Sequence, residues 1–378
     1  MNLHLNRFRA GKVGTAGAVA VAMGIASLAS VVPVGASPNP HTSHSQLAAA
    51  KAEVAIAMKT PTGIDQTIPL KTKPPKGKTV VWLQCELSSC ADMGKGIKAA
   101  ATALGWHYKQ LNFLTSDSTT LITALHQALI YKPTAVSFSG APQALWASVL
   151  PAYRAAKVPI IPVVIGPNRT SPDVPVNLGD FTQGGTSLGD WFISNSNGKG
   201  HALIVDIPAF PVLTEYKTGA LRAIAKNCSS CVTTNFEGTL TEVGSGTLVP
   251  DIVAALQKDP SVNYVLCSDD IFISSLPSAL KAAGITNVKI AGGQPEPSDL
   301  QNITSGSESA GVNISNTILG WEVVDSVARW VEGMKIPYED GGTKQQLLVA
   351  SNVKSDNLTS YVTPTNYPSL YKKLWKVG

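Results

Sequence analysis

The chain has 378 residues and a mass of 39.5 kDa, which is too long for one ordinary hydrophobic core and fits two domains of typical size. Hydrophobic residues make up 44% of it and charged residues only 15%, which excludes a disordered, collagen-like or coiled-coil chain. The net charge is +5, but three of these charges fall in residues 1–36, which hold no acid, so the remainder carries only +2. No concentrated basic face is visible, and we expect no nucleic-acid partner.

Residues 1–36 predict an export signal. A basic start with Arg7, Arg9 and Lys12 precedes a long apolar run, and small residues lead up to Ala36, as a signal peptidase requires. A membrane anchor is the alternative, but several glycines and a proline within the run weaken a permanent spanning helix. Cleavage near Ala36 would place the protein in the periplasm or at the cell exterior, and the absence of a cysteine at this site argues against a lipid anchor.

Five cysteines agree with export. Cys85 and Cys90, and likewise Cys228 and Cys231, each enclose a short polar segment, and a disulfide closing such a loop contributes roughly 2 kcal/mol. Free thiols, a redox Cys-x-x-Cys or half of a zinc site are the alternatives, although the nearby histidines lack zinc-ligand spacing. We therefore predict two disulfides and no metal site, and we expect Cys267, which ends an apolar strand, to be a buried thiol.

The pattern along the chain predicts an arm followed by an α/β body. Residues 37–77 are rich in proline and hold one short alanine-rich helix near residues 46–59, which is typical of a linker packed on a surface. From Lys78 onward, apolar strands without alternation are each followed by a helix, which indicates parallel sheets covered on both faces. The predicted strands are 79–84, 107–113, 134–138 and 158–165, then 201–206, 231–236, 263–267 and 288–291. The predicted helices are 92–104, 118–131, 143–156, 213–226, 247–258 and 272–283.

This pattern runs twice, in units of about 110–130 residues, which predicts two similar lobes. A strand at 310–314, a helix near 318–331 and an extended segment at 346–350 come late in the chain and could complete either sheet.

The sequence lacks the common catalytic and nucleotide-binding motifs. Thr72 stands where a phosphate loop ending in Gly77-Lys78-Thr79 needs its first glycine, and no G-x-G-x-x-G follows the first strand. The histidines of the body begin strands or lie within a helix, so a hydrolase would have to rely on acids.

Ligands of parallel α/β sheets bind beyond the carboxyl ends of the strands, where this sequence has mostly uncharged polar and aromatic residues. Asp269 and Asp270 follow an apolar strand, and their carboxylates could cap the next helix or accept hydrogen bonds from ligand hydroxyls or an amine. The candidate ligand-binding residues are Cys85, Glu86, Ser88, Ser89, Ser139, Gly140, Val164, Ile165, Phe210, Tyr216, Asp269, Asp270, Gln294 and Asn313.

The order and spacing of these segments resemble the type I periplasmic solute-binding proteins, in particular the ribose- and galactose-binding branch that serves ABC importers. The resemblance covers residues 78–354, and its clearest motifs are Val265–Asp270, Val288–Gly293 and Ala156–Ile161. It implies an α/β fold of two Rossmann-like lobes with parallel sheets, joined by a three-strand hinge. It also implies the lobe boundaries, with lobe 1 at 78–181 plus 315–342 and lobe 2 at 182–314 plus 343–378.

The resemblance further implies a function that needs neither catalysis nor a cofactor. A small-molecule ligand, such as a sugar or a sugar-like compound, would be captured between the lobes and delivered to an ABC transporter permease, with the protein acting as a monomer. A ligand-sensing receptor module for a membrane sensor is the main alternative. A secreted hydrolase using Glu86 with Asp269 or Asp270 is a less favoured one.

Several positions depart from the family pattern. Asp269 stands where the family usually has an Asn, Gln294 where many sugar binders have an Asp, and Tyr216 near a frequent Arg. Val164 and Ile165 replace an Asp-Arg pair that holds sugar hydroxyls. Because a buried hydroxyl without a partner costs roughly 1–3 kcal/mol, the resemblance implies a ligand that is less hydroxylated on the lobe 1 side, or one held by other polar groups and aromatic stacking.

Overall fold

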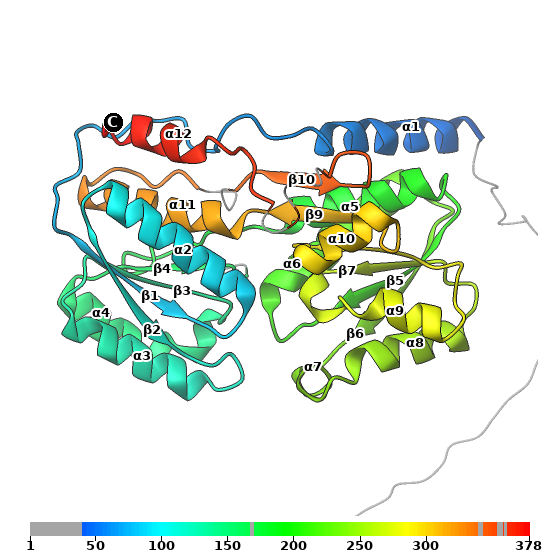
Figure 1. Ribbon diagram of the computed structural model, residues 1–378, viewed down its shortest axis with the longest axis horizontal. Coiled ribbons are helices and arrows are strands. Elements are labelled where there is room, and N and C mark those ends of the chain that lie inside the picture. The colour runs from blue at the N-terminus through cyan, green and yellow to red at the C-terminus, as the bar shows by residue number, and fades with distance from the viewer. Residues whose placement is uncertain (1–39, 167–169, 339–342, 354–357, 359–360) are drawn as a thin grey trace, which may run out of the picture. The chain divides into compact units, whose positions relative to one another are not determined.

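The computed structural model describes residues 40–166, 170–338, 343–353, 358 and 361–378, and it contains two separate sheets (Figure 1). The predicted export signal lies outside the described residues. All strand pairs of the first sheet are parallel. Three of its strands are buried on both faces, as the lack of alternation predicted. Its strands, in sheet order, are β2 (His107–Asn112), β1 (Thr79–Gln84), β3 (Ala135–Ser139) and β4 (Ile160–Val163).

Helices of the first lobe connect these strands. Asp117 caps the second of them by accepting a hydrogen bond from the backbone amide of Thr119 at 2.9 Å. The predicted helix 143–156 is interrupted, because two 3-10 turns (Gln143–Leu145 and Ala147–Val149) precede its helical end. The helices are α2 (Ser88–Ala103), α3 (Ser118–Ile130) and α4 (Leu150–Ala156).

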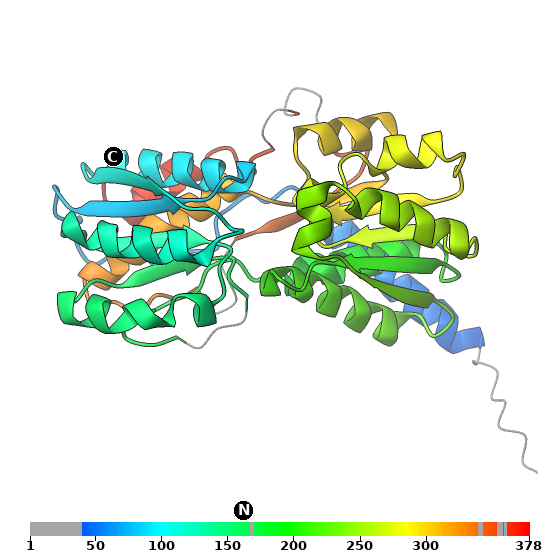
Figure 2. The ribbon, with the colours of Figure 1, turned by 90° about the horizontal axis from the view of Figure 1, so that it is seen from below.

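The second sheet has six strands, of which only the edge strand β10 runs antiparallel to its neighbour. Its strands, in sheet order, are β10 (Gln345–Leu348), β9 (Ala310–Ile314), β8 (Lys289–Gly293), β7 (Tyr264–Cys267), β5 (His201–Asp206) and β6 (Val232–Glu237). Figure 2 shows helices on both faces of this sheet. They are α5 (Thr182–Asn195), α6 (Pro211–Asn227), α7 (Leu240–Ser245), α8 (Leu248–Lys258), α9 (Leu276–Ala282) and α10 (Pro297–Ser305).

The three connections expected between the lobes come after β4, after β9 and after the long helix α11 (Asn316–Val331). The chain passes between the lobes twice more, in the arm before β1 and after β10. α11 follows a strand of lobe 2 but packs on α2 of lobe 1. The two helices approach so closely that a Cβ on Gly96 would lie 2.1 Å from the carbonyl oxygen of Thr317, and one on Gly320 would lie 2.3 Å from that of Met93. Two glycines therefore fix α11 to lobe 1, and the predicted two-lobed α/β fold with three crossovers is confirmed.

The C-terminal segment belongs to both lobes, which corrects the expected assignment of residues 343–378 to lobe 2 alone. β10 joins the lobe 2 sheet, whereas α12 (Tyr367–Leu374) packs on α11. The ring of Trp375, just after α12, stacks on Trp321 of α11 with centroids 5.2 Å apart and an angle of 7°. This apolar stacking returns the end of the chain to lobe 1.

The N-terminal arm contacts both lobes. Its helix α1 (Pro40–Ala57) packs beside α5, and the side chain of Gln46 donates a hydrogen bond to the Lys226 carbonyl of lobe 2 at 3.1 Å. Further along, the backbone amide of Leu70 donates to the carbonyl of Leu374 beside lobe 1 at 2.9 Å. No helix in the described parts of the chain combines the length and apolar composition needed to cross a membrane.

A buried carboxylate ties these late and early segments together. Asp325, which is fully buried on α11, accepts hydrogen bonds from Arg329 Nε at 2.6 Å, Tyr338 Oη at 2.8 Å and Trp375 Nε1 at 2.7 Å. Arg329 in turn donates to the carbonyl of Ile68 in the arm at 2.6 Å. The Asp325–Arg329 ion pair therefore joins the arm, α11 and the C-terminal segment.

We expect Asp325→Ala to lower the free energy of unfolding by about 3–5 kcal/mol, because it leaves the buried guanidinium without its counterion. The matched control is Asp92→Ala, which removes an ion pair to Lys95 on the exposed face of α2 and should cost no more than about 1 kcal/mol. Chemical denaturation measures both. Equal effects of the two substitutions would contradict the role assigned to Asp325.

Candidate ligand-binding cleft

The carboxyl ends of strands from both sheets meet at one pocket between the lobes. Lobe 1 contributes residues that follow β1, β3 and β4, and lobe 2 contributes residues that follow β5, β7 and β8. Eight of the fourteen candidate residues line this pocket: Cys85, Ser89, Ser139, Gly140, Val164, Phe210, Asp269 and Gln294. Because residues after parallel strands lie at one edge of the sheet, where such sheets bind ligands, residues that are far apart in the sequence meet here.

The protein's own side chains leave little free space in this pocket. The cavity volume is about 40 Å³, little more than one water molecule occupies. Pockets for small organic ligands typically measure about 300–1,000 Å³. Phe181, Phe272 and Met93, which were not among the candidate residues, supply much of the apolar wall. Because the cavity is so small, a ligand of sugar size can enter only if the lobes separate.

Among the described residues that line this pocket, Asp269 is the only one with an ionisable side chain. One carboxylate oxygen accepts a hydrogen bond from the Ile271 amide at 3.2 Å and caps the short turn that follows β7. The other oxygen accepts from the side-chain amide of Gln294 at 2.7 Å. Burial raises the pKa of Asp269 well above its usual value. Asp269 therefore has the capping role expected for one of the two acids, and its recognition of a ligand stays a prediction.

Two pocket residues have left-handed backbone conformations. Val164 has a φ of 48° and Gln294 a φ of 53°. A β-branched residue such as valine rarely adopts a positive φ, and such strain persists where the surrounding structure imposes it, often at functional sites. The Val164 amide donates to the Leu178 carbonyl at 2.7 Å, and its Cγ1 would lie 2.7 Å from a Cβ on Gly179, so the backbone is held tightly at this crossover.

Two further candidate residues lie at the rim and not in the lining. Glu86 accepts hydrogen bonds from the amide and the hydroxyl of Thr115 and therefore faces the loop after β2. Ser88 Oγ donates to a carboxylate oxygen of Glu296 at 2.8 Å, which is a bond from lobe 1 to lobe 2. The hydrolase alternative paired Glu86 with Asp269 or Asp270, but Glu86 is engaged with Thr115 and does not line the pocket.

The remaining candidates lie behind the pocket or beside it. Tyr216 is 1% exposed, and its ring packs against Phe181 with centroids 5.1 Å apart and beside Gly293. Asp270 is also 1% exposed, and Ile165 is buried. Asn313 lines a neighbouring small pocket that includes Gln294 and Glu296.

Three carboxyl groups form a buried acidic cluster behind Asp269. Burial, followed by the charges of the neighbouring acids, raises the pKa values of Asp270 and Glu308 well above their usual range. Burial also raises the pKa of Asp299 to about 6, although its carboxylate accepts a hydrogen bond from the Glu296 amide at 2.9 Å. The three carboxyl groups of this cluster therefore stay protonated to a higher pH than exposed carboxyl groups do.

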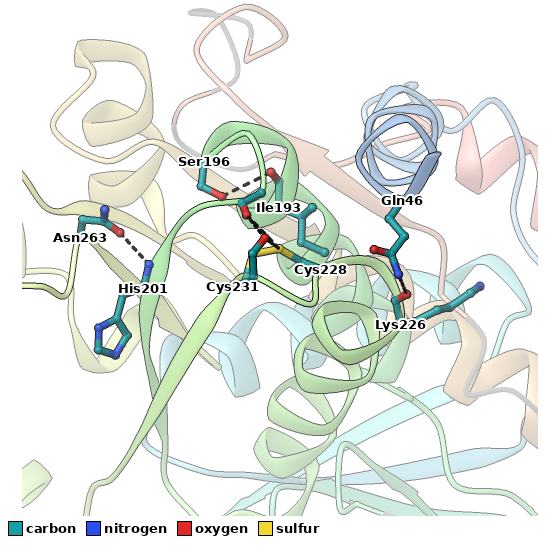
Figure 3. Close-up of a disulfide and its surroundings, with 10 residues drawn as sticks. Gln46, Ile193, Ser196, His201, Lys226, Cys228, Cys231 and Asn263 are labelled. Atoms are coloured by element: carbon teal, nitrogen blue, oxygen red, sulfur yellow. Dashed lines mark hydrogen bonds between the residues drawn. A yellow bond between two sulfur atoms is a disulfide. The ribbon is translucent and has the colours of Figure 1, made fainter. Parts of the chain in front are cut away.

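Both predicted disulfides are present, and Cys267 is a buried free thiol as expected. Cys85–Cys90 joins the end of β1 to the first turn of α2, from which Ser89 lines the pocket. Cys228–Cys231 lies at the start of β6, near the point where Gln46 of the arm contacts the Lys226 carbonyl (Figure 3). Among the described residues, no group of three or more His, Cys, Asp or Glu side chains is arranged to hold a metal ion.

Residues 86–335, about two thirds of the chain, match the family model described as a periplasmic binding protein domain. The chain belongs to this family. Its membership confirms the resemblance seen in the sequence, and periplasmic binding proteins are solute-binding and not catalytic. No curated protein matches the chain.

Solved structures of sugar-transport proteins share the fold at low sequence identity. GanP, a glucose-galactose binding protein from Geobacillus stearothermophilus, has a TM-score of 0.64 and 16% identity, with 73% of this chain and 99% of that chain covered. An ABC transporter solute-binding protein from Agrobacterium vitis, bound with α-D-tagatopyranose, has a TM-score of 0.64 and 17% identity over 76% and 100% of the two chains. A periplasmic ribose ABC transporter protein from Conexibacter woesei has a TM-score of 0.64 and 17% identity over 75% and 96%.

The acidic cluster predicts a pH-dependent stability for this periplasmic binding protein. A pKa of about 6 in the folded state, against about 3.9 in an unfolded chain, means that Asp299 stabilises the fold below pH 4 and loses this contribution as the pH rises through 6. Asp299→Asn keeps an acceptor for the Glu296 amide. We expect the substitution to raise the free energy of unfolding by on the order of 2 kcal/mol more at pH 7.5 than at pH 4.5.

Chemical denaturation at the two pH values measures this difference, with Asp259→Asn as the matched control, because Asp259 is half exposed where β5 begins and lies away from the acidic cluster. A variant whose gain in unfolding free energy is the same at both pH values would contradict the assignment.

The two disulfides provide a second, internally controlled prediction. Replacing either pair by serines should lower the free energy of unfolding by about 2 kcal/mol, since the closed loops are similar in length. Only the Cys85→Ser/Cys90→Ser variant should increase native-state hydrogen exchange in the loop 86–89, because only this disulfide borders the cleft. Equal exchange in that loop for both variants would show that the disulfide does not shape the cleft.

Proposed function

We propose that the protein captures a small organic ligand, a sugar or a sugar-like compound, between its two lobes and delivers it to an ABC transporter. The observation that carries this proposal is the pocket at which the strand ends of both lobes meet, with Asp269 and Gln294 on one side and Ser139 on the other. The family membership supports the same role, and the solved relatives with bound sugars suggest the class of ligand.

The mechanism requires the lobes to separate and close. A ligand that contacts both lobes stabilises the closed arrangement, and only this difference in contact can shift the equilibrium between open and closed forms. The Ser88–Glu296 hydrogen bond adds a direct link between the lobes that exists only when they are close. The closed form is then the one that the permease recognises.

The pocket offers both polar and aromatic recognition. The carboxylate of Asp269 accepts hydrogen bonds, and the side-chain amide of Gln294 can both donate and accept. Phe210 and Phe272 stack with centroids 6.0 Å apart and present apolar faces to the same pocket. Micromolar affinity corresponds to roughly 8 kcal/mol, which a few buried hydrogen bonds and aromatic contacts supply after the costs of ordering.

This role also supports the remaining expectations about the protein. Residues 1–36 would be removed near Ala36 on export, and the mature protein would act as a monomer outside the cytoplasm. The two disulfides support an oxidising compartment. Binding and release leave the ligand unchanged and require no cofactor.

The test begins with a thermal-shift screen of sugars, polyols, nucleosides and small aromatic acids, because a ligand at a hundred times its dissociation constant adds about 2.7 kcal/mol of stability. For the compound that binds, calorimetry of Asp269→Ala should show an affinity at least about tenfold lower, equivalent to about 1.4 kcal/mol. The matched control is Asp259→Ala. Asp259 is half exposed near His201, where β5 begins, and so lies at the sheet edge away from the cleft.

Undiminished binding by the Asp269 variant would place the ligand outside this pocket. Conversion of the ligand to a product during the titration would contradict the transport role.

A further inference from the structure

A second pocket opens directly beside the ligand pocket, at the mouth of the cleft. We call it the mouth groove. Leu114 and Leu145 of lobe 1 and Leu240 of lobe 2 form its apolar walls, and none of the described residues that line it is charged. Thr115, Gly140 and Phe210 line both pockets, so the two spaces are directly adjacent.

The three leucines of the mouth groove are unusually exposed. Leu114 is 49%, Leu145 45% and Leu240 43% exposed. They account for three of the eight large hydrophobic side chains that are exposed in the described parts of the chain. A single exposed leucine needs no explanation, but apolar side chains that converge on a cleft from two lobes indicate a surface that another apolar group covers.

The polar groups of the site lie at the other end of the same space. Asp269 and Gln294 line the inner pocket and not the mouth groove. Phe210 stands between the two ends, half buried and stacked on Phe272. On the lobe 1 side, the inner pocket offers Val164 in place of a charged hydrogen-bonding group. Of these two spaces, the carboxyl and amide groups of the site therefore line only the inner pocket, and the three exposed leucines line only the mouth groove.

We propose that the ligand is amphipathic, with a hydroxylated head near Asp269 and an apolar aryl or alkyl substituent in the mouth groove. This inference rests on the proposed function and specifies its substrate class: a glycoside or a similarly substituted polyol in place of a free sugar. The substituent is covered by both lobes on closure because the groove has walls from both. In the closed form the substituent therefore makes contacts that a free sugar lacks, and these contacts stabilise closure.

The experiment compares matched pairs of probes by calorimetry: D-glucose, D-galactose, D-xylose and D-ribose, each with its phenyl β-glycoside. At least one phenyl glycoside should bind about tenfold or more tightly than its parent sugar, since burying a phenyl ring removes a large apolar area from water. Leu145→Ser/Leu240→Ser should remove most of this preference. The control is Ile130→Ser, which changes an equally apolar side chain that is 78% exposed and lies outside the groove, and which should leave the preference intact.

The outcomes separate this inference from the proposed function. Free sugars that bind as tightly as their glycosides would overturn the inference and leave the transport role standing. A glycoside preference that survives the double substitution would overturn the assignment to the mouth groove. If the double variant keeps its glycoside affinity but no longer supports uptake in cells, the leucines contact the transporter instead, and the inference is overturned. If no compound of this panel or of the wider screen binds, the proposed function fails as well.

Discussion

The site depends on one geometric constraint, that parallel strands all deliver their following residues to the same edge of the sheet. Each lobe therefore gathers the loops after its strands at one edge, and the connections between the lobes turn these two edges towards each other. Ser139 at the end of β3 and Asp269 after β7 are 130 residues apart in the sequence, yet they line one pocket. No local motif carries the function, and the pocket exists only while both sheets and the crossovers hold their places.

The packing that holds those crossovers is concentrated on α11. Gly96 and Gly320 allow α11 to lie against α2, the Asp325–Arg329 pair joins it to the arm and the C-terminal segment, and Trp321 stacks on Trp375. The arm adds a further link between the lobes, because the Met58 carbonyl accepts a hydrogen bond from Gln346 of β10 at 3.1 Å while Ile68 contacts Arg329. The residues that make these contacts do not line the ligand pocket, so they hold the lobes together without filling it.

Much of this arrangement could be predicted from the sequence because it follows from local patterns. Strands such as 79–84 and 201–206 are short, apolar and bounded by turn residues, and residues directly after strands fall at the cleft. The helices α5, α7, α10 and α12 were missed, since glycine-rich or short polar segments carry a weak helical pattern. Phe181 and Phe272 enter the pocket from a crossover and from a turn, where no periodicity exists. Tyr216 was expected at the ligand, but the rotation of α6 turns it into the core beside Gly293, and rotation of a helix about its axis depends on its packing partners.

The central claim is that a ligand closes the two lobes on itself, and a distance between the lobes tests it most directly. Gln127 on α3 and Gln257 on α8 are exposed, lie on different lobes and can be replaced by cysteines for spin labelling, with Cys267 changed to serine. Pulsed electron spin resonance then gives the distribution of distances between the labels with and without a saturating ligand. The account predicts a shorter and narrower distribution when the ligand is bound. An unchanged distribution at full occupancy would contradict it.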